Sequence, residues 1–124
     1  MFVVNADKTI ECTRGDCGAF TVGAMLNNSA HTFQSGDIIR FMVYGKKDCE
    51  TVYLRKDVTV SSATQTVQIV LSSADTKFGG IINKATDFWY SVELNPDTAQ
   101  QTLIGNDKDG AKVFTLYPEG NDEV

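Results

Sequence analysis

Apolar and polar residues alternate along most of this chain, and no segment keeps a helical period for three turns. Alternation with a period of two places successive side chains on opposite faces of the backbone, as in a strand with one buried face. The clearest example is residues 87–94, where four apolar side chains alternate with Trp89, Ser91 and Glu93. The pattern therefore predicts a protein made almost entirely of β-strands.

Turn-forming residues divide the alternating segments into seven or eight short strands. The predicted strands are residues 9–13, 18–26, 38–44, 49–56 with 58–60 as an extension, 66–71, 87–94, 102–105 and 113–117. At most one helical turn is expected, near residues 72–77, where Ser73 is a suitable N-cap. This spacing predicts an all-β fold, an antiparallel β-sandwich that is immunoglobulin-like in size but lacks the Cys–Trp–Cys spacing of antibody domains.

The length of 124 residues is that of one domain. We expect a single sandwich over residues 1–118 and an acidic, frayed tail over residues 119–124. Arg40 and Trp89 are expected to face away from the core. The alternation predicts the following core side chains: Phe20, Val22, Ala24, Leu26, Ile39, Phe41, Val43, Val67, Ile69, Leu71, Phe88, Tyr90, Val92 and Leu94.

The charge balance bears on possible partners. The chain has 11 Lys and Arg against 16 Asp and Glu, a net charge of −5. Nucleic acid and anionic membranes attract proteins with a basic surface, so we expect neither as a partner. No apolar stretch approaches the ~20 residues of a membrane-spanning helix. The first residues also lack the basic and apolar regions of a signal peptide, so none is expected.

Three cysteines, Cys12, Cys17 and Cys49, form an odd set. Secreted domains with a disulfide framework more often have an even number, so we expect reduced thiols, with a Cys12–Cys17 bridge across a tight hairpin as an alternative. A zinc site would need four ligands, and the single histidine, His31, is near no cysteine in the sequence. We therefore expect no metal and no cofactor.

Motifs for catalysis are missing from the sequence. It contains no GxGxxG, GxxxxGK[ST], HExxH or GxSxG pattern. His31 lies in a turn-like segment and is expected to be solvated. The acidic residues in the segment 106–110 lack the glutamate that ends a calcium loop, so this segment is interpreted as a hairpin tip. We expect a protein that is not an enzyme and has no catalytic residues.

The tripeptide Arg14-Gly15-Asp16 lies between two predicted strands. The same tripeptide occurs in integrin ligands, but a turn is needed here, and Gly15 permits a positive φ. We expect the Asp16 carboxylate to accept the backbone N–H of Gly18.

Gly36-Asp37 places a second Asp after a Gly at the start of a strand. Arg14 is expected to pair with Asp16, Asp37 or Asp75 and to join neighbouring loops at one end of the sandwich. These residues are interpreted as determinants of the fold.

Aromatic side chains outside the predicted core leave two interpretations open. Tyr44, Tyr53 and Trp89, with Tyr117, could stack against sugars if they shared one exposed face. Large aromatic residues are also enriched at subunit interfaces and in cores. We favour a core or interface role over a carbohydrate platform.

The order of short motifs resembles that of small β-sandwich modules in tailed-phage and prophage tail proteins. The matching segments are I-x-x-T-R-G-D-C-x-x-F at 10–20, F-x-x-G-D-x-I-x-F-x-V at 33–43, I-x-L-x-x-x-D-T at 69–76, F-W-Y-S-V-E-L at 88–94 and T-L-I-G at 102–105. The resemblance extends from residue 9 to about residue 117. Cys17 stands where Thr or Ser is usual, and Ser91 where Asp is usual.

The sequence is similar to the N-terminal sandwich of phage baseplate upper proteins, which attach receptor-binding machinery to the tail. This resemblance implies a structural or adaptor module of a virion, with other tail proteins as partners. Its location would be the virion, or the bacterial cytoplasm before assembly of a prophage product. Exposed strand edges also favour a homo-oligomer. A different class of function is the alternative: a carbohydrate-binding or adhesin-like β-sandwich at a cell surface.

Overall fold

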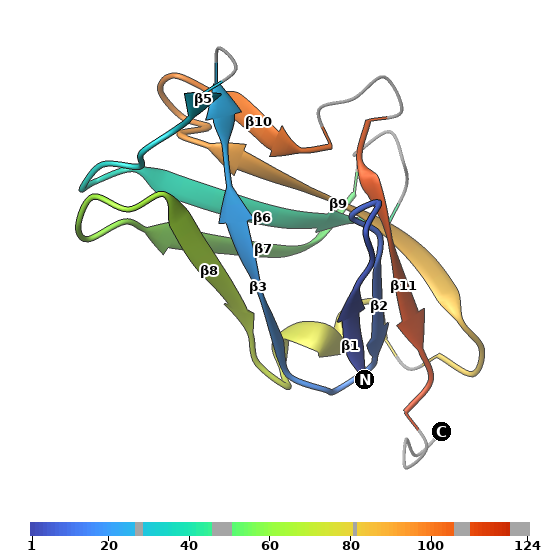
Figure 1. The fold of residues 1–124 in the computed structure, drawn as a ribbon. Helices are drawn as coiled ribbons and strands as arrows, with labels where there is room; N and C mark the ends of the chain where they lie inside the picture. Colours follow the sequence, from blue (N-terminus) through green and yellow to red (C-terminus); the bar gives the residue numbers. More distant parts are fainter. Residues whose placement is uncertain (27–28, 46–50, 81, 106–109, 120–124) are drawn as a thin grey trace.

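The computed structural model describes residues 1–26, 29–45, 51–80, 82–105 and 110–119, and Figure 1 shows their arrangement. Its elements are β1 Phe2–Val4, β2 Ile10–Thr13, β3 Gly18–Gly23, β4 Met25–Leu26, β5 Ser29–Ala30, β6 Ile38–Tyr44, β7 Val52–Thr59, β8 Thr66–Leu71, the 3-10 turn η1 Asp75–Lys77, β9 Thr86–Leu94, β10 Gln101–Ile104 and β11 Lys112–Tyr117. The all-β class predicted from the alternation is confirmed.

The strands form two layers. The larger sheet has the order β1-β2-β11-β9-β6-β7, and β10 pairs with β9 beside this path. The smaller sheet contains β3 and β8, which cross in front of the larger sheet in Figure 1, and β4 and β5 form a short ribbon. One pairing, between β2 and β11, is parallel, whereas the sequence predicts only antiparallel pairs. A parallel pair needs a long connection, and the chain between these two strands provides one.

The core lies between the layers and has an aromatic centre. Phe20 of the smaller sheet packs edge-on against Phe41 and Tyr90 of the larger sheet, with ring centroids 5.7 and 6.3 Å apart. This geometry is the favoured one for aromatic pairs. Every predicted core residue whose side chain the structure describes is buried, which leaves out Leu26. The prediction of which faces are buried is therefore confirmed.

The first strand was missed by the sequence prediction. β1 pairs with β2 in an antiparallel hairpin whose turn holds Lys8 at φ 75°. The Tyr90 hydroxyl donates to the Lys8 carbonyl, which joins this hairpin to the core. Phe2 packs closely over Gly18, so that a Cβ atom at position 18 would lie 2.2 Å from the Phe2 ring.

The helical turn also differs from the prediction. η1 begins after Ala74 and has no side-chain cap, so the prediction of Ser73 as N-cap is wrong. The Ser73 hydroxyl instead donates to the Gly15 carbonyl at 2.6 Å. The backbone N–H of Asp75, at the start of η1, donates to the Ser72 hydroxyl at 3.2 Å.

Candidate functional site

The turn 14–16 is held by one buried side chain that the sequence analysis did not single out. Thr76 of η1 is fully buried, and its Oγ1 accepts the backbone N–H of Gly15 at 3.0 Å. The same hydroxyl donates to the Asp16 carbonyl at 2.8 Å, and Gly15 has φ 89°. Two of the motifs that carry the phage resemblance, T-R-G-D and D-T, therefore touch each other. A threonine in a short turn has no periodic signal, so only that shared resemblance pointed to it.

Arg14 contacts η1 and the end of the chain. Its guanidinium donates to the Lys77 carbonyl at 3.2 Å and lies 3.9 Å from the Glu119 carboxylate. The side chain is largely buried. These contacts replace the predicted ion pairs with Asp16, Asp37 or Asp75, each of which has other partners. Arg14 therefore joins η1 to the segment after β11.

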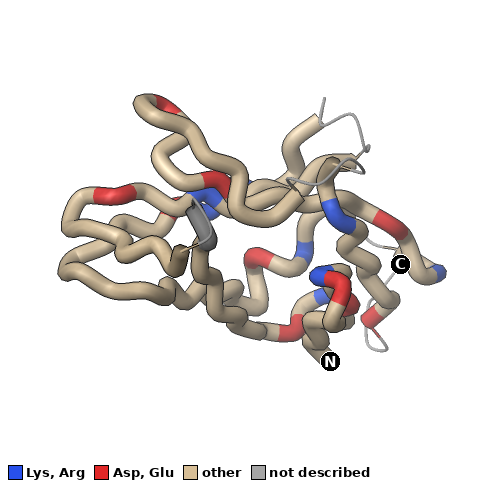
Figure 2. The backbone as a smooth tube through the Cα atoms, turned by 45° about the horizontal axis from the view of Figure 1, so that its top comes forward, with Lys and Arg blue, Asp and Glu red and all other residues tan. Residues whose placement is uncertain are grey.

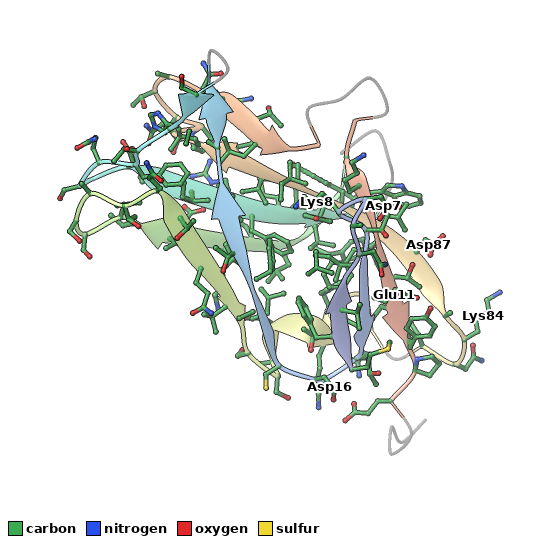
Figure 3. All side chains as sticks on the ribbon, in the orientation of Figure 1. Asp7, Lys8, Glu11, Asp16, Lys84 and Asp87 are labelled. Atoms are coloured by element: carbon green, nitrogen blue, oxygen red, sulfur yellow. The ribbon has the colours of Figure 1, made fainter. Side chains whose placement is uncertain are left out.

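Asp16 lies at the end of the sandwich where β1 starts (Figure 3). Its carboxylate forms an ion pair with the Met1 ammonium group. The predicted hydrogen bond from the Gly18 N–H is not formed, because the Asp16 side chain turns toward the N-terminus. The turn itself is closed by the Asp16 N–H, which donates to the Thr13 carbonyl at 3.0 Å. Asp16 therefore takes part in the turn through its backbone.

Asp75 connects η1, which follows β8 of the smaller sheet, to β7 of the larger sheet. Its carboxylate pairs with the Lys56 ammonium group of β7 and accepts the Ser72 N–H at 2.8 Å. Burial acts to raise the pKa of Asp75, but the hydrogen bonds from Lys56 and Ser72 outweigh it and leave this pKa below its usual value. Lys56 and Asp75 thus hold the edge of β7 near η1.

Gly36 and Asp37 form a separate cluster at the start of β6, away from the N-terminal strands (Figure 1). The Asp37 carboxylate accepts the Gln34 N–H at 2.9 Å and the Asn95 amide at 3.2 Å, and both contacts lower its pKa. Asn95 in turn accepts the Ile38 N–H at 2.9 Å. The predicted role of Gly36-Asp37 at a turn agrees with these contacts. The prediction that Gly36-Asp37 and Arg14 lie at the same end of the sandwich is wrong.

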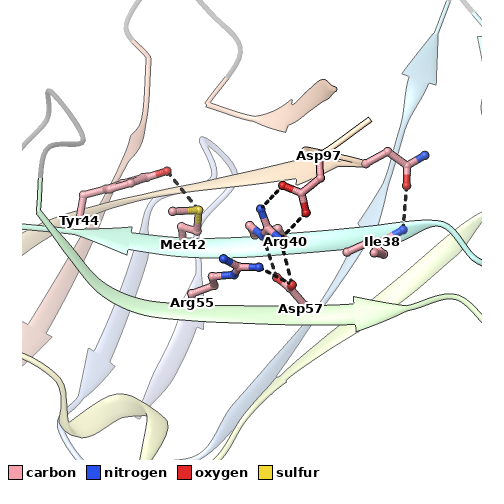
Figure 4. Close-up of polar contacts among 8 residues, drawn as sticks. Ile38, Arg40, Met42, Tyr44, Arg55, Asp57 and Asp97 are labelled. Atoms are coloured by element: carbon pink, nitrogen blue, oxygen red, sulfur yellow. Dashed lines mark hydrogen bonds and ion pairs between the residues drawn. The ribbon is translucent and has the colours of Figure 1, made fainter. Parts of the chain in front are cut away.

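An ionic cluster covers the outer face of the larger sheet (Figure 4). Arg40 points away from the core as predicted, yet it is only 7% exposed. Its guanidinium binds Asp57 through two hydrogen bonds of 2.9 and 3.2 Å, and Asp97 through two of 3.3 and 3.0 Å. These bonds lower the pKa values of both carboxyl groups. Arg40 therefore ties β6 to β7 and to the loop after β9.

The aromatic residues outside the core do not share one face. Tyr44 and Trp89 are neighbours on β6 and β9, but Tyr44 is buried and its hydroxyl lies 3.2 Å from Ser91 Oγ. Tyr53 is exposed and packs edge-on against Phe88, with centroids 5.5 Å apart, on the core side of the sheet. The Tyr117 hydroxyl donates to Glu11 at 2.7 Å. The three residues Tyr44, Tyr53 and Trp89 therefore form no common stacking surface.

The cysteines and the histidine lie apart. Cys12 is buried and Cys17 exposed, and both are free thiols. Cys49 and the acidic segment 106–109 are outside the described residues. His31 packs edge-on against Phe33 with centroids 5.4 Å apart and is half-buried, so it is partly exposed to solvent.

Two kinds of feature are absent from the described part of the chain. It has no group of three or more His, Cys, Asp or Glu residues that could hold a metal ion. None of its helices is long and apolar enough to cross a membrane.

The smaller sheet differs from the rest of the molecule in charge. Residues 17–36 and 58–74 contain no Lys, Arg, Asp or Glu, and these ranges include all of β3 and β8. Figure 2 shows long runs of the chain without a charged residue. The outward-facing residues of this sheet are exposed, namely Ala19, Thr21, Gly23, Thr66, Gln68 and Val70. Charged residues are also depleted at the centres of protein–protein interfaces.

A shallow groove adjoins the same sheet. It lies beside the β7–β8 connection, has a volume of about 210 Å³ and is lined by residues 58–62, 64 and 66–68. None of these residues carries a charge. The groove therefore extends the neutral surface toward β7.

Comparison with known proteins gives no match: no protein-family model fits the chain, and no curated protein or solved structure is significantly similar to it.

Proposed function

We propose that this chain is a non-enzymatic assembly module that binds other protein chains, as a structural or adaptor component of a phage or prophage tail. The observation that carries the proposal is the neutral, exposed sheet formed by β3 and β8. The backbone groups at an exposed edge of a sheet can pair with another chain. Such an edge and a flat uncharged face suit protein–protein binding better than the recognition of a charged small molecule.

The polar motif residues support a structural role. The backbone of Gly15 and Asp16 is bonded to Thr76, and the Asp37 carboxylate is bonded to Gln34 and Asn95. Arg14 is largely buried against η1. Groups used in this way within the fold stabilise loops and are poorly placed to bind a ligand. This also argues against an integrin-ligand role for the Arg14-Gly15-Asp16 tripeptide.

The assignment to a virion rests on the resemblance of five short motifs between residues 9 and about 117. The contact between the T-R-G-D and D-T motifs gives a physical reason why they occur together. In this proposal the partners are other tail proteins, and the location is the virion, or the bacterial cytoplasm before assembly.

The test is to look for the chain in particles. Prophages of the source strain are induced, particles are purified on a density gradient, and an antibody against the chain is applied to gradient fractions and to negatively stained particles. We expect the chain to sediment with intact tails and the antibody to label one position on them. Particles that form normally without the chain and carry no label contradict the proposal.

The alternative, a carbohydrate-binding surface protein, is tested with the same material. A glycan array and calorimetry with cell-wall fragments should detect no binding tighter than roughly millimolar. Micromolar binding that is lost in Trp89→Ala would favour the carbohydrate role instead.

A further inference from the structure

The edge of β8 that faces away from β3 has unused backbone groups. Among the described strands, β8 pairs with β3 alone, in an unbroken register from Thr66 to Leu71. At Thr66 both the N–H and the carbonyl are bonded to the Thr64 hydroxyl. Beyond the β3 ladder, no described residue forms a backbone hydrogen bond to residues 67–71. The central and C-terminal part of this strand is therefore open to a further strand.

β8 lacks the features that normally protect such an edge. Natural edge strands are shortened, bulged, interrupted by Pro or charged. The edge strand of the other layer, β7, has these features: it carries Arg55, Lys56 and Asp57, and its register with β6 shifts between Val43 and Tyr44. β10 is also bulged, and β1 has only three residues. β8, by contrast, is six residues of T-V-Q-I-V-L with no charge, no Pro and no bulge.

The opposite edge of the smaller sheet is less available. β1 lies beside β3, and the Phe2 ring covers Gly18. A strand that extends this sheet would therefore add at β8.

We propose that two copies of this chain pair through β8, antiparallel about a two-fold axis, so that the two smaller sheets join into one four-stranded sheet. The inference rests on the proposed role as an assembly module and names its partner as a second copy. The charge of the chain argues for this partner: two molecules with a net charge of −5 repel each other, and β8 lies within a segment, residues 58–74, that has no charged residue. A two-fold axis brings the neutral segment of one copy against the same segment of the other copy.

The residues of β8 suit such a pairing. With Ile69 opposite Ile69 of the second copy, Gln68 lies opposite Val70 and Val67 lies opposite Leu71. This register leaves the occupied backbone groups of Thr66 out of the pairing. Directly opposite residues of antiparallel strands share a face, so this register keeps the buried side chains together. Val70, which is 52% exposed, gains a neighbour. The two Gln68 side chains lie diagonally across the two-fold axis on the same face of the joined sheet.

The interface is expected to be small. A strand of six residues is about 20 Å long, so the dimer should be a weak one, with a dissociation constant of roughly 1–100 µM. Sedimentation velocity across a concentration series that spans this range should show a monomer–dimer equilibrium. Thermal unfolding and circular dichroism of each variant establish that it is folded.

The decisive variant is Gln68→Lys. The Gln68 side chain points outward, so the change leaves the core intact, but it places two ammonium groups diagonally across the two-fold axis on the same face of the joined sheet. We expect the dissociation constant to increase at least tenfold, and 1 M salt to reverse part of this increase by screening. The matched control, Gln101→Lys, makes the same change on the edge strand β10 and should dimerise like the unmodified chain.

A chain that stays monomeric throughout the series overturns the pairing, as does a Gln68→Lys variant that dimerises normally. If the purified chain is monomeric but is found in particles, only the β8 pairing is overturned, and the proposed assembly role stands. A dimer that is absent from particles overturns only the virion role.

Discussion

Thr76 Oγ1 accepts the backbone N–H of Gly15 at 3.0 Å across 61 residues of sequence. The hydroxyl is fully buried and also donates to the Asp16 carbonyl, so one side chain satisfies two backbone groups of the same turn. Buried backbone groups are costly to leave without a partner. This contact therefore determines how the turn between β2 and β3 lies against η1.

Thr76→Val should destabilise the protein by about 1–3 kcal/mol, because it keeps the shape of the side chain but leaves the Gly15 N–H without its acceptor. Thr76→Ser is the control, since it keeps the hydroxyl and should recover most of this loss. The measurement is urea unfolding followed by tryptophan fluorescence. Equal free energies of unfolding for the Val variant and the unmodified protein would refute the role of the hydroxyl.

Asp16→Ala should change the free energy of unfolding by no more than about 0.5 kcal/mol. The Asp16 side chain is 44% exposed, and its ion pair with the Met1 ammonium group is at the surface, where such pairs contribute little. The backbone bonds of Asp16 to Thr13 and Thr76 do not depend on its carboxylate. Thermal unfolding of Asp16→Ala and Asp16→Asn checks this prediction. The loss of a buried hydrogen bond to a charged group typically costs ~2 kcal/mol. A loss of that size or more would mean that the carboxylate supports the turn.

Alternation was enough to predict the all-β class and the buried faces of β3, β6, β8 and β9. It could not predict β1, because Val3 and Val4 are both exposed and three residues give too short a pattern. The parallel pairing of β2 with β11 depends on contacts between the two ends of the chain, about which local periodicity says nothing.

The candidate site was predicted less well than the fold. The turns at 14–16 and 36–37 were recognised from their Gly and Asp residues, but their partners were not. Tertiary packing brings Thr76 and Asn95 to these turns and Lys56 to Asp75, and no sequence spacing marks these three partners. The neutral surface was visible in the sequence as residues 17–36 and 58–74, but two charge-free segments become one surface only when β3 pairs with β8.

Stability should decrease below about pH 4 through the Arg40 cluster. The bonds from Arg40 lower the pKa of Asp57 in the folded state, so the stability that Asp57 contributes is present above its unfolded pKa of about 3.9 and is lost as the pH falls through the lower folded value. Asp57 is one-third exposed, so we expect a contribution of roughly 1 kcal/mol or less.

Urea unfolding at pH 7 and pH 2.5 measures this contribution. The difference between the two free energies of unfolding should be smaller in Asp57→Asn than in the unmodified protein. Asp97→Asn should have a weaker effect, because the Asp97 side chain is 68% exposed and its pair with Arg40 is better screened. An unchanged pH dependence in Asp57→Asn would exclude this carboxyl group as a source of acid sensitivity.

Cys17 should react with thiol reagents in the folded protein, whereas Cys12 should not. The thiolate is the reactive form, and burial, aided by the negative charge of Asp16, raises the pKa of Cys12 to about 11. Cys12 is also fully buried, whereas Cys17 is exposed. Iodoacetamide labelling at pH 8 with peptide mapping checks this. Cys12 should become labelled only after unfolding in urea, and labelling of both residues at the same rate in the folded protein would contradict the structure.

Gly18→Ala should destabilise the protein by about 1–3 kcal/mol, because the new Cβ atom would lie 2.2 Å from the Phe2 ring and force the β1 strand to move. The matched control is Gly23→Ala at the other end of β3, where a Cβ atom would meet only the Gln65 carbonyl oxygen at an ordinary 3.5 Å. Adding Phe2→Ala to Gly18→Ala should remove the clash, so the double variant should lose less stability than the sum of the single changes. Urea unfolding of the four proteins measures this coupling, and strictly additive losses would show that Phe2 does not pack over Gly18.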